Sequence, residues 1–400
     1  MNWGKMLSDP ESFSEEIKAK IRRALLQTVK GEFSAHGDYP VFVTKKKFSQ
    51  TAMTDGLPLL VPHIPQVITD WAGIKDNSIT HDELLILDLE TTGLTRGGGM
   101  LAFLIGIGYY ENDNFIVEQY FLPEPEAEVN AFELLLPHLE RKSVLVTFNG
   151  KTFDLPILES RFLHNQLWID LRSKPHLDLL LLARRLWKKK VPSCALETLE
   201  YYILGQIRDK ELDIESEIIP QTYFQFLITG EPELLKRIFL HNQTDVLHTA
   251  ALLALISAQI DYPLPQERDD RIDYHAVAKL YRSQGYLEEG KNILLALTEE
   301  KYLTAELVYD LGLIFKQEKN WREAERFFRR GTELLHLPSM LELGKLLERK
   351  NKDYEGALLL AEALLQRMEA EPVQNENKIP DLKKRITRLK SKMEKRPLTK

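Results

Sequence analysis

The spacing of apolar residues changes along the chain, from short apolar runs to a helical spacing after residue 177. Four short apolar runs between residues 84 and 148 (LLILDLE, MLAFLIGIGYY, FIVEQYFL and SVLVTF) predict buried strands, and the turn ENDN joins two of them in a hairpin. Helical spacing in EAEVNAFELLLPHLE and FDLPILESRFL places helices among these strands. From residue 177 the apolar positions recur at helical spacing. The pattern therefore predicts a mixed α/β core with a helical finish.

A second helical region begins after DYPLPQERDDRIDY, where two prolines and dense charge mark a boundary. Three tandem segments beyond it have small residues and aromatics at the spacing of tetratricopeptide repeats, with a 34-residue period. The third is slightly offset, with Gly344 and Ala357 in the matching positions. The period relates three residues of the first segment, Tyr281, Gly290 and Leu294, to Phe315, Ala324 and Phe328.

We therefore expect four segments. Residues 1–81 form a partly irregular N-terminal extension, 82–260 the α/β domain and 261–273 a linker. Residues 274–400 form tetratricopeptide-like helical repeats that end in a basic capping helix.

Composition narrows the class of protein. The 44% hydrophobic and 28% charged content is that of a soluble globular protein. A single cysteine, Cys194, excludes an intramolecular disulfide and a cysteine-built zinc site. The first residues lack the apolar core of a signal peptide, and the most apolar stretch is shorter than the ~20 residues that span a bilayer. We expect a cytoplasmic protein without membrane contact.

The charge is unevenly distributed. The chain has a net charge of -7, yet residues 184–190 read RRLWKKK and residues 378–400 hold ten Lys or Arg and two Asp or Glu. Either basic cluster could guide nucleic acid, because phosphate contacts need only a local patch. A solvated helix face explains the C-terminal cluster equally well.

Two carboxylates stand at the end of the first strand, in LLILDLETTGL. Asp88 and Glu90 are two residues apart, so they lie on the same face of the strand and need a positive partner if buried. Asp154, at the opening of a helix, and Asp245, within a late helix, are further oxygen ligands. His241 lies one turn before Asp245 on the same helix face.

Such a set of carboxylates suits two divalent metal ions, Mg²⁺ or Mn²⁺, which prefer oxygen ligands. Two ions held ~3.5–4 Å apart hydrolyse phosphodiester bonds, one generating hydroxide and the other stabilising the leaving oxygen. His241 would accept the proton of the attacking water.

The motifs DLETTGL, FNGKTFD and HNQTD, in this order, resemble those of the DEDD 3′-5′ exonucleases of the ribonuclease H-like superfamily. With the repeats that follow, the chain resembles the bacterial YprB type, also called the mitomycin repair factor exonuclease. The resemblance implies a ribonuclease H-like (DnaQ-like exonuclease) core with a mixed sheet, followed by an all-α repeat domain. It implies Asp88, Glu90, Asp154 and Asp245 as metal ligands and His241 as general base. It further implies DNA as substrate, DNA repair, and a helicase or other protein partner.

One feature departs from this family. Histidine-type members usually have the spacing H-x4-D, whereas His241 and Asp245 have H-x3-D, the offset of the tyrosine-type subfamily. The departure concerns the general base and leaves the metal ligands unchanged.

Residues beside the acids are expected to contact the terminal nucleotide through backbone hydrogen bonds and base stacking. Turn formation and core packing are the alternative roles for this group. Nearby, His176 and Asp178 are interpreted as helix-capping or supporting residues. The expected substrate contacts are Thr91, Thr92, Gly93, Leu94, Asn149, Lys151 and Phe153.

Two other functions stay open at this stage. An RNA exonuclease agrees with the sequence as well, because no residue of the motifs is identified as a contact to the 2′-hydroxyl group, which distinguishes RNA from DNA. A non-catalytic adaptor would hold nucleic acid while its repeats recruit a partner, although a degenerate site would be expected to lack at least one of the four carboxylates.

Overall fold

The chain forms two compact units, Met1–Asp273 and Tyr274–Lys400. The structure is a computed structural model. It describes residues 15–35, 37–49, 56–61, 63–75, 79–93, 100–232, 234–299, 301–370 and 378–394.

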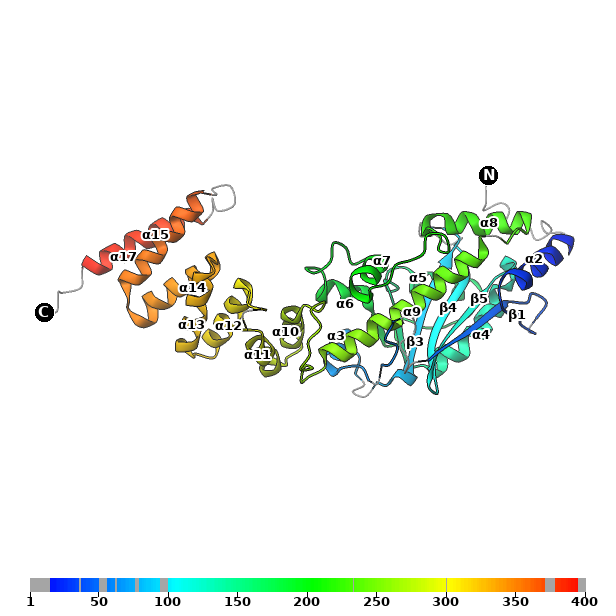
Figure 1. The fold of residues 1–400 in the computed structure, drawn as a ribbon, viewed down its shortest axis with the longest axis horizontal. Coiled ribbons are helices and arrows are strands. Elements are labelled where there is room, and N and C mark those ends of the chain that lie inside the picture. Colours follow the sequence, from blue (N-terminus) through cyan, green and yellow to red (C-terminus); the bar gives the residue numbers. More distant parts are fainter. Residues whose placement is uncertain are drawn as a thin grey trace. The chain divides into compact units, whose positions relative to one another are not determined.

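A seven-stranded mixed sheet forms the centre of the N-terminal unit (Figure 1). Its strand order is β1-β2-β5-β4-β3-β6-β7. The pairs β3–β6 and β6–β7 are parallel, and the other neighbours are antiparallel. This confirms the predicted mixed α/β core. The strands are β1 (Glu32–Phe33), β2 (Phe42–Ser49), β3 (Leu84–Thr91), β4 (Ala102–Glu111), β5 (Asn114–Phe121), β6 (Val144–Thr147) and β7 (His176–Asp178).

The predicted hairpin is β4 and β5. Both strands are almost continuously buried, as expected for strands covered on both faces. Asn112 occupies the turn between them with a φ of 53°, a left-handed conformation that asparagine tolerates better than most residues.

Part of the region expected as an N-terminal extension completes this sheet. β2 pairs with β5 along its whole length, and β1 pairs with β2. The three consecutive lysines Lys45, Lys46 and Lys47 interrupt the apolar alternation of β2, which is why its sequence does not predict a strand.

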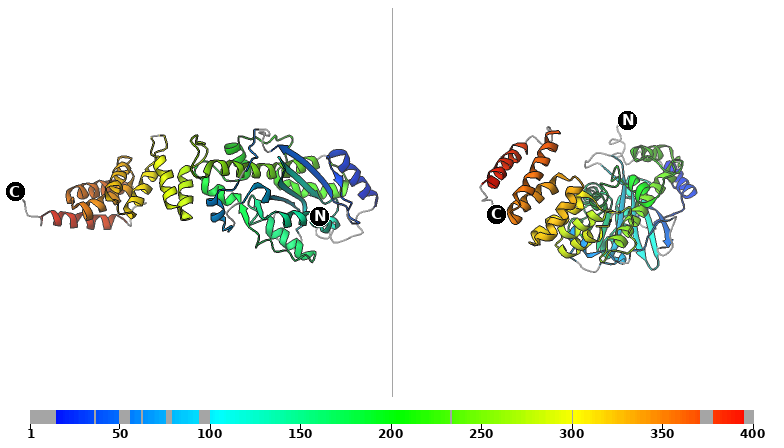
Figure 2. Two further views of the ribbon diagram at one scale, coloured as in Figure 1. Left: turned by 90° about the horizontal axis from the view of Figure 1, so that it is seen from below. Right: turned by 60° about the vertical axis from the view of Figure 1, so that its left-hand side comes forward.

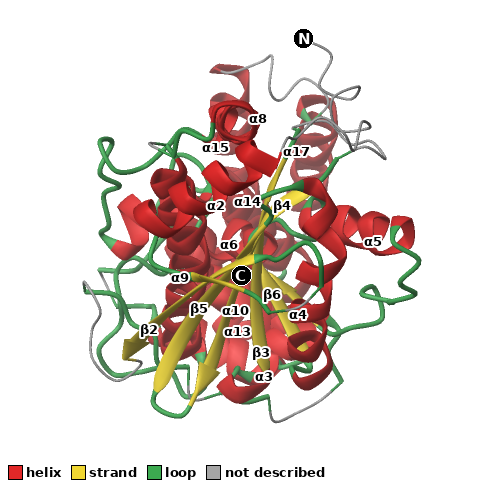
Figure 3. Cartoon of the chain, turned by 90° about the vertical axis from the view of Figure 1, so that its right-hand side faces the viewer, coloured by secondary structure: helices red, strands yellow, loops and turns green. Residues whose placement is uncertain are grey.

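Helices cover both faces of the sheet. The long helix α9 packs against β3, β4 and β5 on one side, while α4 and α5 lie on the other (Figure 3). The helices of this unit are α2 (Glu15–Thr28), α3 (Gln66–Ala72), α4 (Glu128–Arg141), α5 (Asp154–His164), α6 (Leu179–Leu186), α7 (Leu196–Leu199), α8 (Ile219–Thr229) and α9 (Leu235–Ile260), with short turns at η2 (His81–Glu83), η3 (Pro125–Ala127), η4 (Glu200–Leu204) and η5 (Ser216–Ile218).

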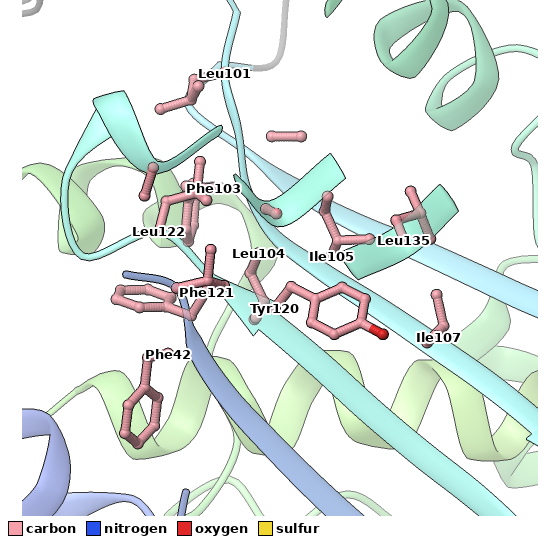
Figure 4. Packing of buried hydrophobic residues seen from close by; sticks show 14 of the residues in the cluster. Phe42, Leu101, Phe103, Leu104, Ile105, Ile107, Tyr120, Phe121, Leu122 and Leu135 are labelled. Atoms are coloured by element: carbon pink, nitrogen blue, oxygen red, sulfur yellow. The ribbon is translucent and has the colours of Figure 1, made fainter. Parts of the chain in front are cut away.

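Aromatic side chains fill the core between sheet and helices (Figure 4). The ring of Phe103 stacks on Tyr223 of α8 with a centroid distance of 4.0 Å. Phe121 lies 5.2 Å from Phe239 of α9. These contacts fix α8 against β4 and α9 against β5.

The C-terminal unit is all-helical (Figure 2). Its successive helices pack as pairs, α10 with α11 and α12 with α13. A Cβ at Gly312 would lie 2.5 Å from the ring of Phe328, so glycine permits close approach of α12 and α13. Whether the pairs are tetratricopeptide repeats stays a prediction. The helices are α10 (Tyr274–Ser283), α11 (Leu287–Ala296), α12 (Ala305–Gln317), α13 (Trp321–Glu333), α14 (Leu337–Leu346), η6 (Leu347–Asn351), α15 (Tyr354–Ala370) and α17 (Ile379–Glu394).

Part of the basic C-terminal cluster has a structural role. The side chain of Glu348 in η6 is 4% exposed and accepts hydrogen bonds from Arg388 at 3.0 Å and Lys392 at 2.9 Å, both in α17. The nearby Arg385 adds a third contact at 3.3 Å. This buried carboxylate thus joins α17 to η6.

We expect Glu348→Gln to destabilise the C-terminal unit by about 2 kcal/mol at neutral pH, because bonds to charged groups contribute roughly that much. Burial raises the pKa of Glu348, but the bonds from Lys392 and Arg388 outweigh it and lower the pKa below 4.5. A carboxylate with a lowered pKa stabilises the fold above its unfolded pKa, and that stability is lost as the pH falls.

The measurement is urea unfolding between pH 7 and pH 3, with the difference from wild type shrinking below about pH 4.5. Glu369→Gln removes an exposed pair with Lys383 and serves as the control with little effect. Equal losses from both variants would contradict this role of Glu348.

No helix in the described ranges has the length and apolar character needed to cross a membrane.

Candidate active site

The register of β3 against β4 sets the positions of the first two acids. Asp88 stands opposite Gly106, and Glu90 stands opposite Leu104. Residues two apart on a strand share a face, so both carboxylates lie on the side of the sheet that α9 covers. Asp88 and Glu90 are both partly buried.

Asn242 of α9 contacts Asp88 directly. Its amide donates to the Asp88 carboxylate at 2.8 Å and to the Asp88 carbonyl at 3.2 Å. Gln119 of β5 in turn donates to the Asn242 carbonyl oxygen at 2.8 Å. The fully buried Asn242 therefore orients Asp88 and links it to the centre of the sheet.

Gly106 makes room for this contact. A Cβ at residue 106 would lie 2.1 Å from Oδ1 of Asn242. We expect Gly106→Ala to displace Asn242, weaken its bond to Asp88 and cost about 1–3 kcal/mol of unfolding free energy. Gly93→Ala is the control, because its Cβ would meet nothing closer than Met100 at 3.9 Å. Thermal unfolding of both variants tests this, and equal melting temperatures would contradict it.

Asp154 is the first residue of α5 and approaches the end of β3 from a different element. Its Oδ1 accepts a hydrogen bond from the backbone N–H of Leu89 at 3.0 Å, the residue between the two strand acids. Asp154 is 8% exposed. The start of α5 is thus joined directly to the acidic end of β3.

Asp245 and His241 come from α9, one turn apart, with His241 Nε2 3.7 Å from an Asp245 oxygen. The Nδ1 atom of His241 lies 2.8 Å from Oδ1 of Asp213. Arg208 pairs with Asp245 at 2.5 Å, with Asp213 at 3.4 Å and with the buried Glu200. The positive charge of Arg208 therefore lies among three carboxylates on this side of the site.

The pKa values show that the four acids act on one another. Desolvation and the negative charges of Asp245, Asp154 and Glu90 raise the pKa of Asp88 well above its usual value. Desolvation and the charges of Asp245 and Asp154 do the same for Glu90. Burial raises the pKa of Asp154 to about 7, with a contribution from the charge of Asp245. Residues from β3, α5 and α9 thus form one cluster of mutually repelling carboxylates.

Unlike the acids, His241 has neighbours that favour its charged form. Burial lowers its pKa, but the bond to Asp213 and the charge of Asp245 outweigh it and hold the pKa above the usual value. For Asp213, burial raises the pKa, while the bond from His241 and nearby charges bring it to about 2. Asp213 therefore stays ionised and accepts a hydrogen bond from Nδ1 of His241, so that in the neutral ring Nδ1 carries the hydrogen and Nε2 is the acceptor.

The expected substrate contacts separate into two groups. Thr91, Gly93 and Phe153 line a cavity of about 490 Å³ together with Glu90 and Asp154. The others lie elsewhere. Thr92 exchanges hydrogen bonds with the backbone of Leu101, Asn149 and Lys151 donate backbone N–H groups to Asp178, and Leu94 is outside the described residues.

Asp178 organises the loop before Asp154. It caps α6 by accepting from Leu180 at 3.1 Å, and it accepts the N–H groups of Asn149 at 2.8 Å and Lys151 at 3.0 Å. The φ of Asn149 is 69°. The helix-capping interpretation of Asp178 is therefore confirmed, and its further bonds to the loop position the start of α5.

Sequence reasoning missed four residues at this site. Asn242 adjoins His241 in HNQTD, so its place on α9 could have drawn attention. Glu200, Arg208 and Asp213 come from η4 and the loop after it, where neither spacing nor periodicity gives a signal.

The donor set fits divalent cations, because four neighbouring carboxylates provide hard oxygen ligands and a strong negative potential, which raises the pKa of Asp88, Glu90 and Asp154. Within the ranges described above, no three His, Cys, Asp or Glu side chains are already arranged around one ion. The carboxylate oxygens of three of the acids have partners within the protein. Asp88 accepts from the Asn242 amide, Asp154 from the backbone N–H of Leu89, and Asp245 from Arg208.

Comparison with known proteins defines the class. Residues 85–257 match the family model described as the RNase_H superfamily, and this range includes all four acids. The N-terminal unit therefore has a ribonuclease H-like fold and is nuclease-like.

The chain belongs to the same family as YprB of Bacillus subtilis (strain 168), described as an uncharacterized protein. The two are 32% identical over 348 residues, which cover 82% of this chain and 81% of YprB. Among solved structures, a family B DNA polymerase from the hyperthermophilic archaeon Pyrobaculum calidifontis matches 52% of this chain with 14% identity and a TM-score of 0.35. The chain spans 29% of the length of that polymerase.

Proposed function

We propose that the protein is a metal-dependent 3′-5′ exonuclease that hydrolyses phosphodiester bonds of DNA. The observation that carries the proposal is the convergence of Asp88, Glu90, Asp154 and Asp245 from β3, α5 and α9 into one electrostatically coupled cluster. Membership of the YprB family and the ribonuclease H-like fold support nuclease chemistry at this position.

The four carboxylates would hold two divalent cations, Mg²⁺ or Mn²⁺. Such a pair, when bound, lowers the pKa of water and stabilises the leaving oxygen. The acids position the cations, and the cavity lined by Phe153 and Thr91 accommodates the terminal nucleotide, with the exposed ring of Phe153 available for base stacking.

His241 is the general base in this proposal. Asp213 holds the Nδ1 side of the ring, so Nε2, which lies on the Asp245 side, accepts the proton of the attacking water. The spacing H-x3-D keeps His241 and Asp245 one helical turn apart on one face of α9, which is compatible with this role.

The helical C-terminal unit would bind a protein partner, with tetratricopeptide-like pairs supplying the surface. We propose DNA repair as the setting and a helicase that exposes single strands as the kind of partner. These assignments follow the family resemblance.

End-labelled strands test polarity and sugar together. The purified chain is incubated with 3′- or 5′-labelled DNA and RNA of one sequence in Mn²⁺, Mg²⁺ or EDTA. We expect the 3′ label to be released at once as a mononucleotide and the 5′-labelled strand to shorten stepwise, on DNA and only with metal.

Immediate release of the 5′ label as a mononucleotide, with stepwise shortening of the 3′-labelled strand, would overturn the proposed polarity. Faster shortening of RNA would replace DNA by RNA as the substrate. Binding of both strands without cleavage in any metal would indicate a nucleic-acid-binding adaptor instead.

A further inference from the structure

The basic segment RRLWKKK surrounds a hollow on the N-terminal unit. Helix α6 and the turn after it direct the apolar residues of this segment inward, and Trp187 is fully buried. Arg184, Arg185 and Lys188 are exposed and line a hollow of about 460 Å³. Trp71 and Cys194 complete its wall.

The positive charge in this hollow is largely uncompensated. In the described part of the chain, no carboxylate forms an ion pair with Arg184 or Lys188. Burial raises the pKa of the Cys194 thiol, and the charges of Arg184 and Lys188 act against that rise. Arg184 and Lys188 can therefore bind an anion from solution. A guanidinium group binds phosphate oxygens in a bidentate manner.

The chain leads from this basic hollow directly to a second one that reaches the acid cluster. The next hollow, of about 590 Å³, begins at Ala195, directly after Cys194, and extends to His241 and Asp245. It shares Ser216 with the Phe153 cavity on the other side of the acids. The middle hollow and the Phe153 cavity therefore meet at Ser216, with Asp245 lining the first and Glu90 and Asp154 lining the second, and consecutive residues of the chain line the basic hollow and the middle hollow.

The middle hollow has the chemistry of a strand-binding site. Tyr201 is 55% exposed and Ile207 is 79% exposed, and both line this hollow beside Arg208 and Lys210. Exposed aromatic rings beside cationic groups bind unpaired bases and backbone phosphates without sequence preference. A duplex would present no free base face to Tyr201, so these residues favour a single strand.

We propose that the hollow of Arg184, Arg185 and Lys188 binds the phosphate backbone of the single strand being degraded, on the 5′ side of the scissile bond. The inference rests on the proposed 3′-5′ polarity. Only the 3′-terminal nucleotide lies beyond the acids, in the Phe153 cavity, and the rest of the strand leaves through the middle hollow toward α6.

The test is the salt dependence of binding, measured without cleavage. Fluorescence anisotropy in EDTA records the affinity of the full chain for labelled single-stranded DNA of about 16 nucleotides. For Arg184→Gln with Lys188→Gln we expect about tenfold weaker binding, and a slope of log K against log salt that is shallower by about 1.4, or about 0.7 for each lost phosphate contact.

Arg23→Gln with Lys30→Gln is the matched control, because it removes one exposed arginine and one exposed lysine in and just after α2. The control variant keeps the wild-type slope, and thermal unfolding verifies that both variants fold. An unchanged slope in the α6 variant, or the same change in both variants, overturns the proposal.

Cleavage separates this inference from the proposed function. The α6 variant is expected to raise KM for the long strand while leaving kcat, and KM for a trinucleotide, unchanged. If the wild type cleaves normally and the variant has the same KM for the long strand, the proposed binding of the strand in the basic hollow is overturned, and the exonuclease is not. Absence of wild-type cleavage overturns the exonuclease, whereas binding in EDTA still reports on the hollow.

Discussion

Asp88→Asn is expected to raise the melting temperature of the metal-free protein while abolishing cleavage. Desolvation and neighbouring acids raise the pKa of Asp88 well above 3.8, so its ionised form destabilises the folded state at neutral pH. The amide has nearly the same shape, removes the charge and still accepts the bond from Asn242. About 1 kcal/mol of relieved repulsion raises the melting temperature by roughly 2–4 °C in a domain of this size.

The pH dependence of this gain has a defined sign. A carboxylate whose pKa is raised on folding destabilises the protein above its unfolded pKa and has no effect where both states are protonated. The gain should therefore be largest near neutral pH and vanish below about pH 4. Asp113→Asn, in the exposed turn between β4 and β5, is the control.

Calorimetry with and without Mn²⁺ makes this measurement. Added Mn²⁺ should stabilise the wild type by mass action and stabilise Asp88→Asn far less. A fall in the melting temperature of the metal-free variant would show that Asp88 is held by compensating contacts, which contradicts a cluster of repelling acids.

Arg208→Met is expected to have the opposite effect on stability. Arg208 pairs with Glu200, Asp213 and Asp245, and the Glu200 side chain is 1% exposed. Removing one partner of a buried ion pair costs about 3–5 kcal/mol, because the remaining charge is left without compensation. The melting temperature should fall by about 10 °C, and Mn²⁺ should restore part of the loss.

Two further variants isolate the cause. The double variant Arg208→Met with Glu200→Gln should recover part of the lost stability, because it removes one of the orphaned charges. Arg172→Met breaks one exposed pair with Glu159 and should cost less than about 1 kcal/mol. Equal stability of Arg208→Met and wild type would contradict the described charge balance.

The parts of the fold that sequence predicted are those with uninterrupted patterns. The strands β3 to β6 are apolar runs bounded by turns, and Asp88 and Glu90 stand out because carboxylates rarely end a buried strand. The mixed α/β core is confirmed. The metal-ligand roles of the acids stay a prediction.

The missed parts depend on contacts between distant segments. The three lysines of β2 interrupt the apolar alternation that would indicate a strand, and β7 is only three residues long. Arg208 and Asp213 reach the site from an irregular loop, where no period relates them to His241. Their function comes from charge compensation in the folded state, which sequence spacing does not record.

In the proposed function, phosphodiester hydrolysis depends on cations held by the four carboxylates. The most direct measurement is the rate of mononucleotide release from uniformly labelled single-stranded DNA while free Mn²⁺ is raised from zero in a chelator-buffered solution. We expect no release without Mn²⁺, a rise steeper than first order in Mn²⁺, and saturation. Release that persists in EDTA, or no release at any Mn²⁺ concentration, would contradict it.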